Sequence, residues 1–295
     1  MLGEVLTAIV TPFRPDGGLD LARFRALASF LVDNGSDGVV VAGTTGEAPT
    51  LTDDERLALV EAAVAEVGHR ATVVAGTGTN DTAHSVQVTR AAHALGADAF
   101  LIVTPYYNKP PQRGIVAHFE AIAAVTDRPL VAYNIPQRSV VNMEPATITQ
   151  LARIPNVTAV KQATTDPGEA RHIVELGLDL YAGNDDLLLP WLELGGVGVI
   201  SVFSHVVGPQ VKELVRLWKS GDHDGARRLN DELMIVNDAL GVTTNPIPVK
   251  TALNLLGHEV GGFRLPLVEA TAAEVAYVRA GLERAGVLAG SGARA

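Results

Sequence analysis

The chain of 295 residues carries 33 acidic and 23 basic residues, which give a formal net charge of −10 at pH 7. This acidic balance, without a clustered Lys/Arg stripe, argues against nucleic acids and anionic membranes as partners. Cysteine is absent, so disulfides and thiolate metal sites are excluded. The N-terminal residues resemble no signal peptide, and apolar runs end within about 8–10 residues, too short to span a bilayer. We therefore expect a cytoplasmic protein.

Short apolar runs alternate along the chain with amphipathic segments. The predicted strands are residues 6–12, 38–43, 72–76, 99–104, 130–133, 157–161, 178–183 and 196–202. Helices are predicted between them at 21–34, 53–67, 82–95, 115–125 and 169–176. Such alternation implies a parallel sheet, and eight units over about 200 residues favour a closed α/β fold, the (β/α)8 TIM barrel, over an open doubly wound sheet.

The strand signals stop at about residue 224. Residues 226–240, 248–256 and 270–285 have helical patterns, with glycine and Asn-Pro turn signals between them. We therefore expect a barrel with the active site over residues 1–223 and a C-terminal helical region over residues 224–295. The glycine-containing tail at 290–295 is expected to be disordered.

Lys161 comes at the end of a predicted buried strand. Residues 157–160 are apolar or β-branched, and the residues after the lysine have the composition of a loop. Burial disfavours the ammonium and lowers a lysine pKa from about 10.4, which raises the fraction of free amine at neutral pH. A neutral amine at the mouth of a sheet can form a Schiff base with a carbonyl substrate. The alternative is a lysine that extends to solvent or pairs with a carboxylate.

Other predicted strands also end in polar side chains, and in a barrel these ends form the rim of the active site. The GTTGE segment at 43–47 offers backbone N–H groups and the hydroxyls of Thr44 and Thr45 to a small carboxylate, or it is simply a tight turn. Tyr133 can transfer protons, although a tyrosine at a strand end is often a packing residue. Arg138 can bind a carboxylate in a bidentate manner or remain a solvated charge.

Motifs for cofactors are weak or absent. Residues 76–81 lie between a strand and a helix but lack the third glycine of a dinucleotide-binding fingerprint. The eight histidines include no HExxH or paired metal spacing. Adjacent Asp185 and Asp186 are weak evidence for a divalent cation, so we predict no metal site.

The GTTGE segment, Tyr133-Asn-Ile-Pro and the strand-end Lys161 together resemble the pyruvate-dependent class I aldolase superfamily, which includes dihydrodipicolinate synthase and N-acetylneuraminate lyase. The resemblance runs in matching order from about residue 6 to the C-terminal helices. Residues 104–107 (TPYY), Arg138 and residues 245–250 (NPIPVK) resemble the dihydrodipicolinate synthase family most. In that family pyruvate condenses with L-aspartate 4-semialdehyde in the diaminopimelate route to lysine.

The resemblance implies catalytic roles for four residues. Lys161 would form an imine with pyruvate, and the imine would act as an electron sink that allows loss of a methyl proton. Tyr133 would move protons on and off the intermediates. Thr44 and Tyr107 would complete the proton relay, with Tyr107 contributed by a neighbouring subunit.

Further implied residues bind the substrates. Thr45 would hold the pyruvate carboxylate, Arg138 would hold the carboxylate of the semialdehyde, and Gly183 and Ile200 would line the pocket through backbone groups. The resemblance implies no metal or organic cofactor, because the lysine supplies the electron sink. It also implies a homotetramer built as a dimer of dimers.

Two departures from the family concern residues beside the site. Gln162 follows the lysine, where the family usually has glutamate. Ser139 and Val140 follow the arginine, where the family usually has Thr-Gly, and this change can alter the shape of the acceptor pocket.

Inhibition by lysine is expected to be weak or absent. The positions that bind lysine in sensitive relatives hold Ala48, Pro49, Asp53, Arg56, Asn80, His84 and Tyr106. Arg56 and His84 replace a histidine and a glutamate, and a cationic or neutral pair should bind the lysine ammonium poorly.

Two other functions remain open. A sister pyruvate-dependent aldolase acting on a 2-oxo sugar acid would use the same lysine and threonine pair, but Arg138 favours an acceptor with a carboxylate. A barrel that binds 2-oxo acids without catalysis would have no need of Lys161, Tyr133, Thr44 and Tyr107 together.

Overall fold

The structure is a computed structural model and describes residues 1–289. Its parallel strands form a closed barrel in chain order, with β8 paired to β1. The strands are β1 (Val5–Ala8), β2 (Gly38–Val41), β3 (Thr72–Gly76), β4 (Ala99–Val103), β5 (Leu130–Asn134), β6 (Val157–Gln162), β7 (Asp179–Ala182) and β8 (Gly198–Ser201). The predicted (β/α)8 TIM barrel is confirmed. The prediction for residues 290–295 lies outside the described residues.

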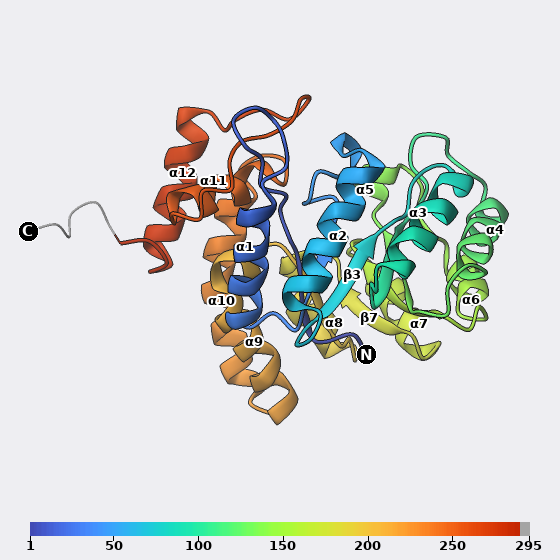
Figure 1. Cartoon of the computed structure of the whole chain (residues 1–295). Coiled ribbons are helices and arrows are strands. Elements are labelled where there is room, and N and C mark those ends of the chain that lie inside the picture. The colour runs from blue at the N-terminus through green and yellow to red at the C-terminus, as the bar shows by residue number, and fades with distance from the viewer. Residues whose placement is uncertain (290–295) are drawn as a thin grey trace, which may run out of the picture.

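Helices follow the strands and surround the barrel (Figure 1). Five lie within a few residues of their predicted positions: α1 (Leu21–Asp33), α2 (Asp53–Val67), α3 (Thr82–Ala94), α4 (Gln112–Ala123) and α7 (Pro167–Glu175). Four others were not predicted: α5 (Pro136–Ser139), α6 (Pro145–Leu151), α8 (Leu188–Glu193) and α9 (Ser204–Ser220). Short 3-10 helices, η1 (Ala48–Thr50) and η2 (Asp185–Leu187), lie in the loops after β2 and β7.

The C-terminal helical region is also confirmed. It contains α10 (His223–Leu240), α11 (Ile247–Leu255) and α12 (Ala272–Arg284), which lie beside α9 on one side of the barrel (Figure 1). Helix α10 begins at residue 223, and the division of the chain there stays a prediction. Among residues 1–289, no helix combines the length and apolar character needed to cross a membrane.

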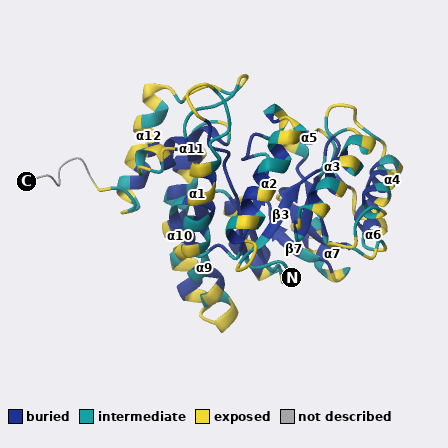
Figure 2. Ribbon diagram, in the orientation of Figure 1, coloured by how far each residue is buried: buried dark blue, intermediate teal, exposed yellow. Residues whose placement is uncertain are grey.

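Apolar side chains fill both the inside of the barrel and the layer between strands and helices. Leu6, Val40, Val74 and Val131 belong to the inner set and are fully buried. Figure 2 shows the strands buried and the outer faces of the helices exposed. Burial on both faces explains why the strands read as nearly continuous apolar runs. The packed interior supports the polar residues at the carboxyl ends of the strands.

Candidate active site

Lys161 lies on β6, paired with Tyr133 on β5 and Tyr181 on β7. Its side chain is 5% exposed, and its Nζ lies 4.3 Å from the centroid of the Tyr133 ring. Burial lowers the pKa of Lys161 to about 8, while the charge of Asp185 opposes this shift. About a tenth of the lysine is therefore free amine at pH 7, far more than for a lysine in water.

A cavity of about 260 Å³ opens at Lys161. Besides Lys161, the predicted site residues that line it are Thr44, Thr45, Tyr133, Arg138 and Gly183. They come from the carboxyl ends of separate strands or the loops after them, as in other barrel enzymes. Two residues that were not predicted as part of the site, Asp185 and Asn245, line the same cavity.

The other two predicted residues lie away from this cavity in the single chain. Ile200 is fully buried on β8, within the apolar interior of the barrel. Tyr107 is 88% exposed and has a left-handed φ of 71°. Its implied role involves a neighbouring subunit, so the single chain does not test it.

Tyr133 is buried, and Thr44 lines the same cavity. Burial raises the pKa of Tyr133 to about 12, and the charge of Arg138 together with the nearby Thr44 side chain opposes that shift. The phenol therefore remains protonated at pH values where much of Lys161 is a free amine. One side of the cavity offers a nucleophile and a proton donor together.

Thr45 is buried in the turn after β2, and its Oγ1 accepts a hydrogen bond of 2.9 Å from Nδ2 of Asn245. Because the amide occupies an acceptor position of Oγ1, the Thr45 hydroxyl proton remains available to a ligand. Nη2 of Arg138 donates to the backbone carbonyl of the same asparagine at 3.3 Å. Asn245 thus contacts both side chains expected to bind carboxylates.

A buried ion pair between Lys250 and Glu47 fixes the turn after β2 in place. Lys250 Nζ donates to Glu47 Oε1 at 2.9 Å and to the Thr11 carbonyl at 3.0 Å, and both charged side chains are fully buried. The Thr11 hydroxyl donates to the Gly46 carbonyl at 2.7 Å. Helix α11 therefore holds the segment that carries the two threonines. The sequence contains both partners in recognisable motifs, but nothing in it pairs them.

Gly183 lies where the chain after β7 passes close to β6. A Cβ atom there would lie 2.7 Å from the Ala163 Cβ and 2.8 Å from the Gln162 carbonyl carbon. Any other residue would force these segments apart, so the position requires glycine because of its close approach. The contact keeps the loop that contains Asp185 against the strand that carries Lys161.

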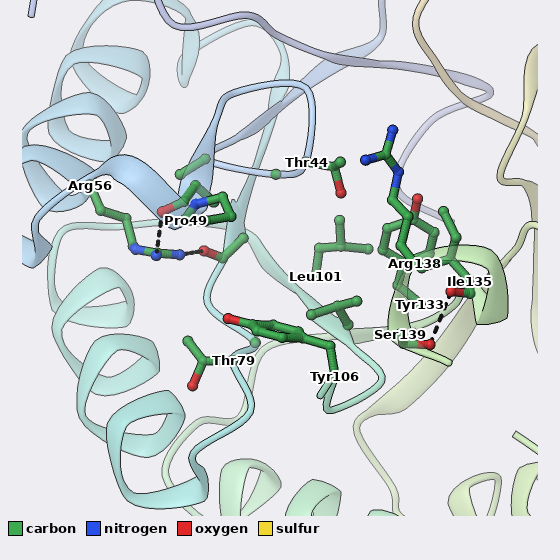
Figure 3. Close-up of a pocket in the computed structure, with 16 residues that line it drawn as sticks. Thr44, Pro49, Arg56, Thr79, Leu101, Tyr106, Tyr133, Ile135, Arg138 and Ser139 are labelled. Atoms are coloured by element: carbon green, nitrogen blue, oxygen red, sulfur yellow. Dashed lines mark hydrogen bonds between the residues drawn. The ribbon is translucent and has the colours of Figure 1, made fainter. Parts of the chain in front are cut away.

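A second cavity of about 250 Å³ shares Thr44, Tyr133 and Arg138 with the first. Figure 3 shows Arg56 and Pro49 across this cavity from those three residues. Four of the seven positions that the resemblance implies for lysine binding line it: Ala48, Pro49, Arg56 and Tyr106. Arg56 is 6% exposed and donates to the carbonyls of Gly76 and Ala48 at 2.7 and 3.3 Å.

The two departures from the family lie beside the cavities. Gln162 is buried, and its Nε2 donates to Glu169 Oε2 at 2.8 Å, a contact in which a glutamate would be repelled. Ser139 donates to the Ile135 carbonyl at 2.9 Å. Val140 has a left-handed φ of 66°, which glycine adopts readily and a β-branched residue does not. The backbone thus keeps a glycine-type turn beside Arg138.

The model of the dihydrodipicolinate synthetase family matches residues 1–285. The 4-hydroxy-tetrahydrodipicolinate synthase of Moorella thermoacetica is 50% identical over 289 residues, which cover 97% of this chain and 99% of the relative. The synthase of Mycolicibacterium paratuberculosis is 49% identical over 288 residues, covering 97% and 96%. The structure of the Cyanidioschyzon merolae enzyme with lysine bound has a TM-score of 0.95 at 42% identity and covers 97% and 99%. The predicted resemblance is confirmed, and the chain belongs to the dihydrodipicolinate synthetase family.

Proposed function

We propose that the chain catalyses the 4-hydroxy-tetrahydrodipicolinate synthase reaction, the condensation of pyruvate with L-aspartate 4-semialdehyde. The observation that carries the proposal is the buried Lys161, whose pKa is lowered to about 8 beside the phenol of Tyr133. The relatives that are about half identical over nearly the whole chain have the same activity in their names. The proposal includes a cytoplasmic location and the diaminopimelate route to lysine.

The first half of the reaction takes place at Lys161. Its neutral amine attacks the ketone carbon of pyruvate, and Tyr133 protonates the oxygen that leaves as water. The resulting iminium withdraws electrons from the methyl group, so the Tyr133 phenolate takes up one methyl proton, which gives an enamine and restores the phenol. The Thr45 hydroxyl holds the pyruvate carboxylate during these steps, with Asn245 fixing its orientation.

In the second half, the enamine carbon attacks the aldehyde carbon of the semialdehyde. Tyr133 donates a proton to the oxygen that becomes a hydroxyl. Arg138, which lines both cavities, holds the carboxylate of the acceptor. The amino group of the condensed product then displaces Lys161 from the imine carbon, which closes the ring and regenerates the free lysine.

The proposed assembly is a homotetramer in which Tyr107 completes the proton relay of a neighbouring subunit. Tyr107 is 88% exposed in the single chain, so it is accessible to a partner. A solved relative at 40% identity is described as a monomeric dihydrodipicolinate synthase variant. Sedimentation velocity of the purified protein tests the tetramer.

The proposed activity is tested by pyruvate consumption with L-aspartate 4-semialdehyde, comparing the wild-type protein with Lys161→Ala. We expect turnover in the wild-type protein and none in the variant. Borohydride trapping of pyruvate gives a second measurement that does not need the acceptor. Trapping without turnover would indicate a sister aldolase instead. If the protein showed neither trapping nor turnover, it would be a barrel without imine chemistry.

A further inference from the structure

Asp185 is a buried carboxylate at the wall of the cavity that contains Lys161. It lies at the start of η2, directly after β7, and is 7% exposed. The backbone N–H groups of Val202 and Phe203 donate to its Oδ2 at 3.0 and 2.9 Å. These partners fix the carboxylate in one position at the carboxyl end of β8.

The hydrogen-bond partners of Asp185 are all uncharged. Within residues 1–289, no basic side chain forms an ion pair with it. Burial holds the pKa of Asp185 above that of an ordinary carboxyl group, while the backbone N–H donors of Val202 and Phe203 and the charge of Lys161 favour its ionised form. A buried carboxylate without a paired cation is costly, so it calls for an explanation in the chemistry of the cavity.

Few charged groups surround Lys161. Asp185 favours a positive charge on its nitrogen, and Arg138, which lines the same cavity, disfavours it. Asp186 also lines the cavity but is exposed to solvent, and the Tyr133 phenol is uncharged at neutral pH. Asp185 is therefore the anionic group whose field on Lys161 is least screened by water.

We propose that Asp185 is the counter-ion of the protonated imine that forms between Lys161 and pyruvate. The inference rests on the proposed function, since it requires the imine. The iminium nitrogen carries a positive charge inside the cavity, and a carboxylate already held by backbone N–H groups stabilises it without reorganisation. Asp185 is thereby an electrostatic positioning residue of the reaction rather than only a support for the loop after β8.

The charge balance of imine formation makes this role measurable. Above the pKa of Lys161, a neutral amine, a ketone and one proton give an iminium and water, so a positive charge is created. Below that pKa, an ammonium and a ketone give an iminium, water and no change of charge. A counter-ion therefore strengthens imine formation at high pH and has little effect at low pH.

The test is Asp185→Asn, in which an amide oxygen still accepts the backbone N–H bonds but the charge is lost. The apparent dissociation constant of pyruvate is measured by borohydride trapping from pH 6 to pH 10. We expect the dissociation constant of the Asp185→Asn variant to differ little from that of the wild-type protein at pH 6. At pH 9 it should be larger by about tenfold for each unit by which the substitution lowers the pKa of Lys161. Asp186→Asn, which removes an exposed carboxylate of the same cavity, should give a much smaller shift.

Each outcome separates the possible roles. If Asp185→Asn weakened pyruvate binding equally at every pH, or did not weaken it at all, the proposed role of Asp185 as a counter-ion would be wrong. An absence of trapping in the wild-type protein would instead overturn the proposed function. Thermal unfolding of each variant is recorded in parallel, and if Asp185→Asn does not fold, Asp185→Ser retains an acceptor for the same backbone groups. The same pH-dependent loss is then expected for the serine variant.

Discussion

Tyr133 and Lys161 are directly paired residues of neighbouring strands, and the lysine nitrogen lies 4.3 Å from the centroid of the tyrosine ring. Burial moves their pKa values apart, that of Tyr133 to about 12 and that of Lys161 to about 8. Over the pH range between these values, the phenol keeps its proton while the amine has lost its own. One environment thus prepares an acid and a nucleophile side by side.

The first prediction concerns pH. The initial rate of imine formation at subsaturating pyruvate should rise about tenfold per pH unit below 8 and level off above it, since only the free amine of Lys161 attacks. Single-turnover trapping with borohydride measures this rate. Tyr133→Phe should keep the same inflection but lower the rate by about 10²–10⁴-fold. An inflection near the ordinary lysine value would contradict the lowered pKa.

Much of the lining of the cavity could be predicted from the residues at the ends of the predicted strands. Lys161, Tyr133 and Arg138 follow or end apolar runs, and a barrel brings such ends to one rim. The missed helix α9 has a physical reason, because it contains Pro209 and a non-helical Val207 that interrupt its pattern.

Contacts between distant segments could not be predicted. The hydrogen bond from Asn245 to Thr45 joins the C-terminal region to the turn after β2, and both residues have ordinary local patterns. Buried Asp185 looked like half of a weak metal motif, because burial and hydrogen bonds from β8 are invisible in the sequence. These features depend on how the barrel closes rather than on local preference.

The second prediction is that Asn245→Ala raises KM for pyruvate by about fivefold to tenfold, the expected loss for one hydrogen bond that orients a binding group. The variant lacks the amide that donates to Thr45 Oγ1, so the Thr45 hydroxyl is no longer oriented with its proton toward the substrate carboxylate. Steady-state kinetics measure KM and kcat separately, and kcat should change less. Asn254→Ala is the matched control, because that exposed asparagine of α11 donates only to the Gly261 carbonyl. Equal effects of the two variants would contradict the assigned contact.

The third prediction concerns the ion pair between Glu47 and Lys250, both fully buried. Glu47→Gln or Lys250→Met should each lower the free energy of unfolding by about 3–5 kcal/mol, because the remaining charge is left buried without its partner. The double variant should lose less than the sum of the single variants. Urea denaturation measures all three. Glu213→Gln, in the exposed pair with Arg216, should change the free energy of unfolding far less than either buried variant.

The fourth prediction is that L-lysine inhibits weakly or not at all. Arg56 is buried beside the second cavity, and its guanidinium donates to the carbonyls of Gly76 and Ala48. His84 Nε2 lies 2.8 Å from Asp53 Oδ1, so this position offers no free carboxylate to an ammonium. A relative from Cyanidioschyzon merolae was solved with lysine bound, which provides a comparison enzyme for the assay. Half-inhibition of this chain at submillimolar L-lysine in steady-state kinetics would refute the prediction.

The fifth prediction is that Val140→Gly increases the free energy of unfolding by roughly 1 kcal/mol. Val140 ends α5 with a φ of 66°, and a β-branched residue in this conformation costs roughly 1–2 kcal/mol, more than the entropy that glycine adds to the unfolded chain. Its side chain is 61% exposed, so little packing is lost. Val268→Gly is the control, because Val268 is 56% exposed without a left-handed φ and should lose stability through entropy alone. Thermal and urea unfolding measure the stability of both variants. If Val140→Gly and Val268→Gly lowered the free energy of unfolding equally, the turn beside Arg138 would hold no backbone strain.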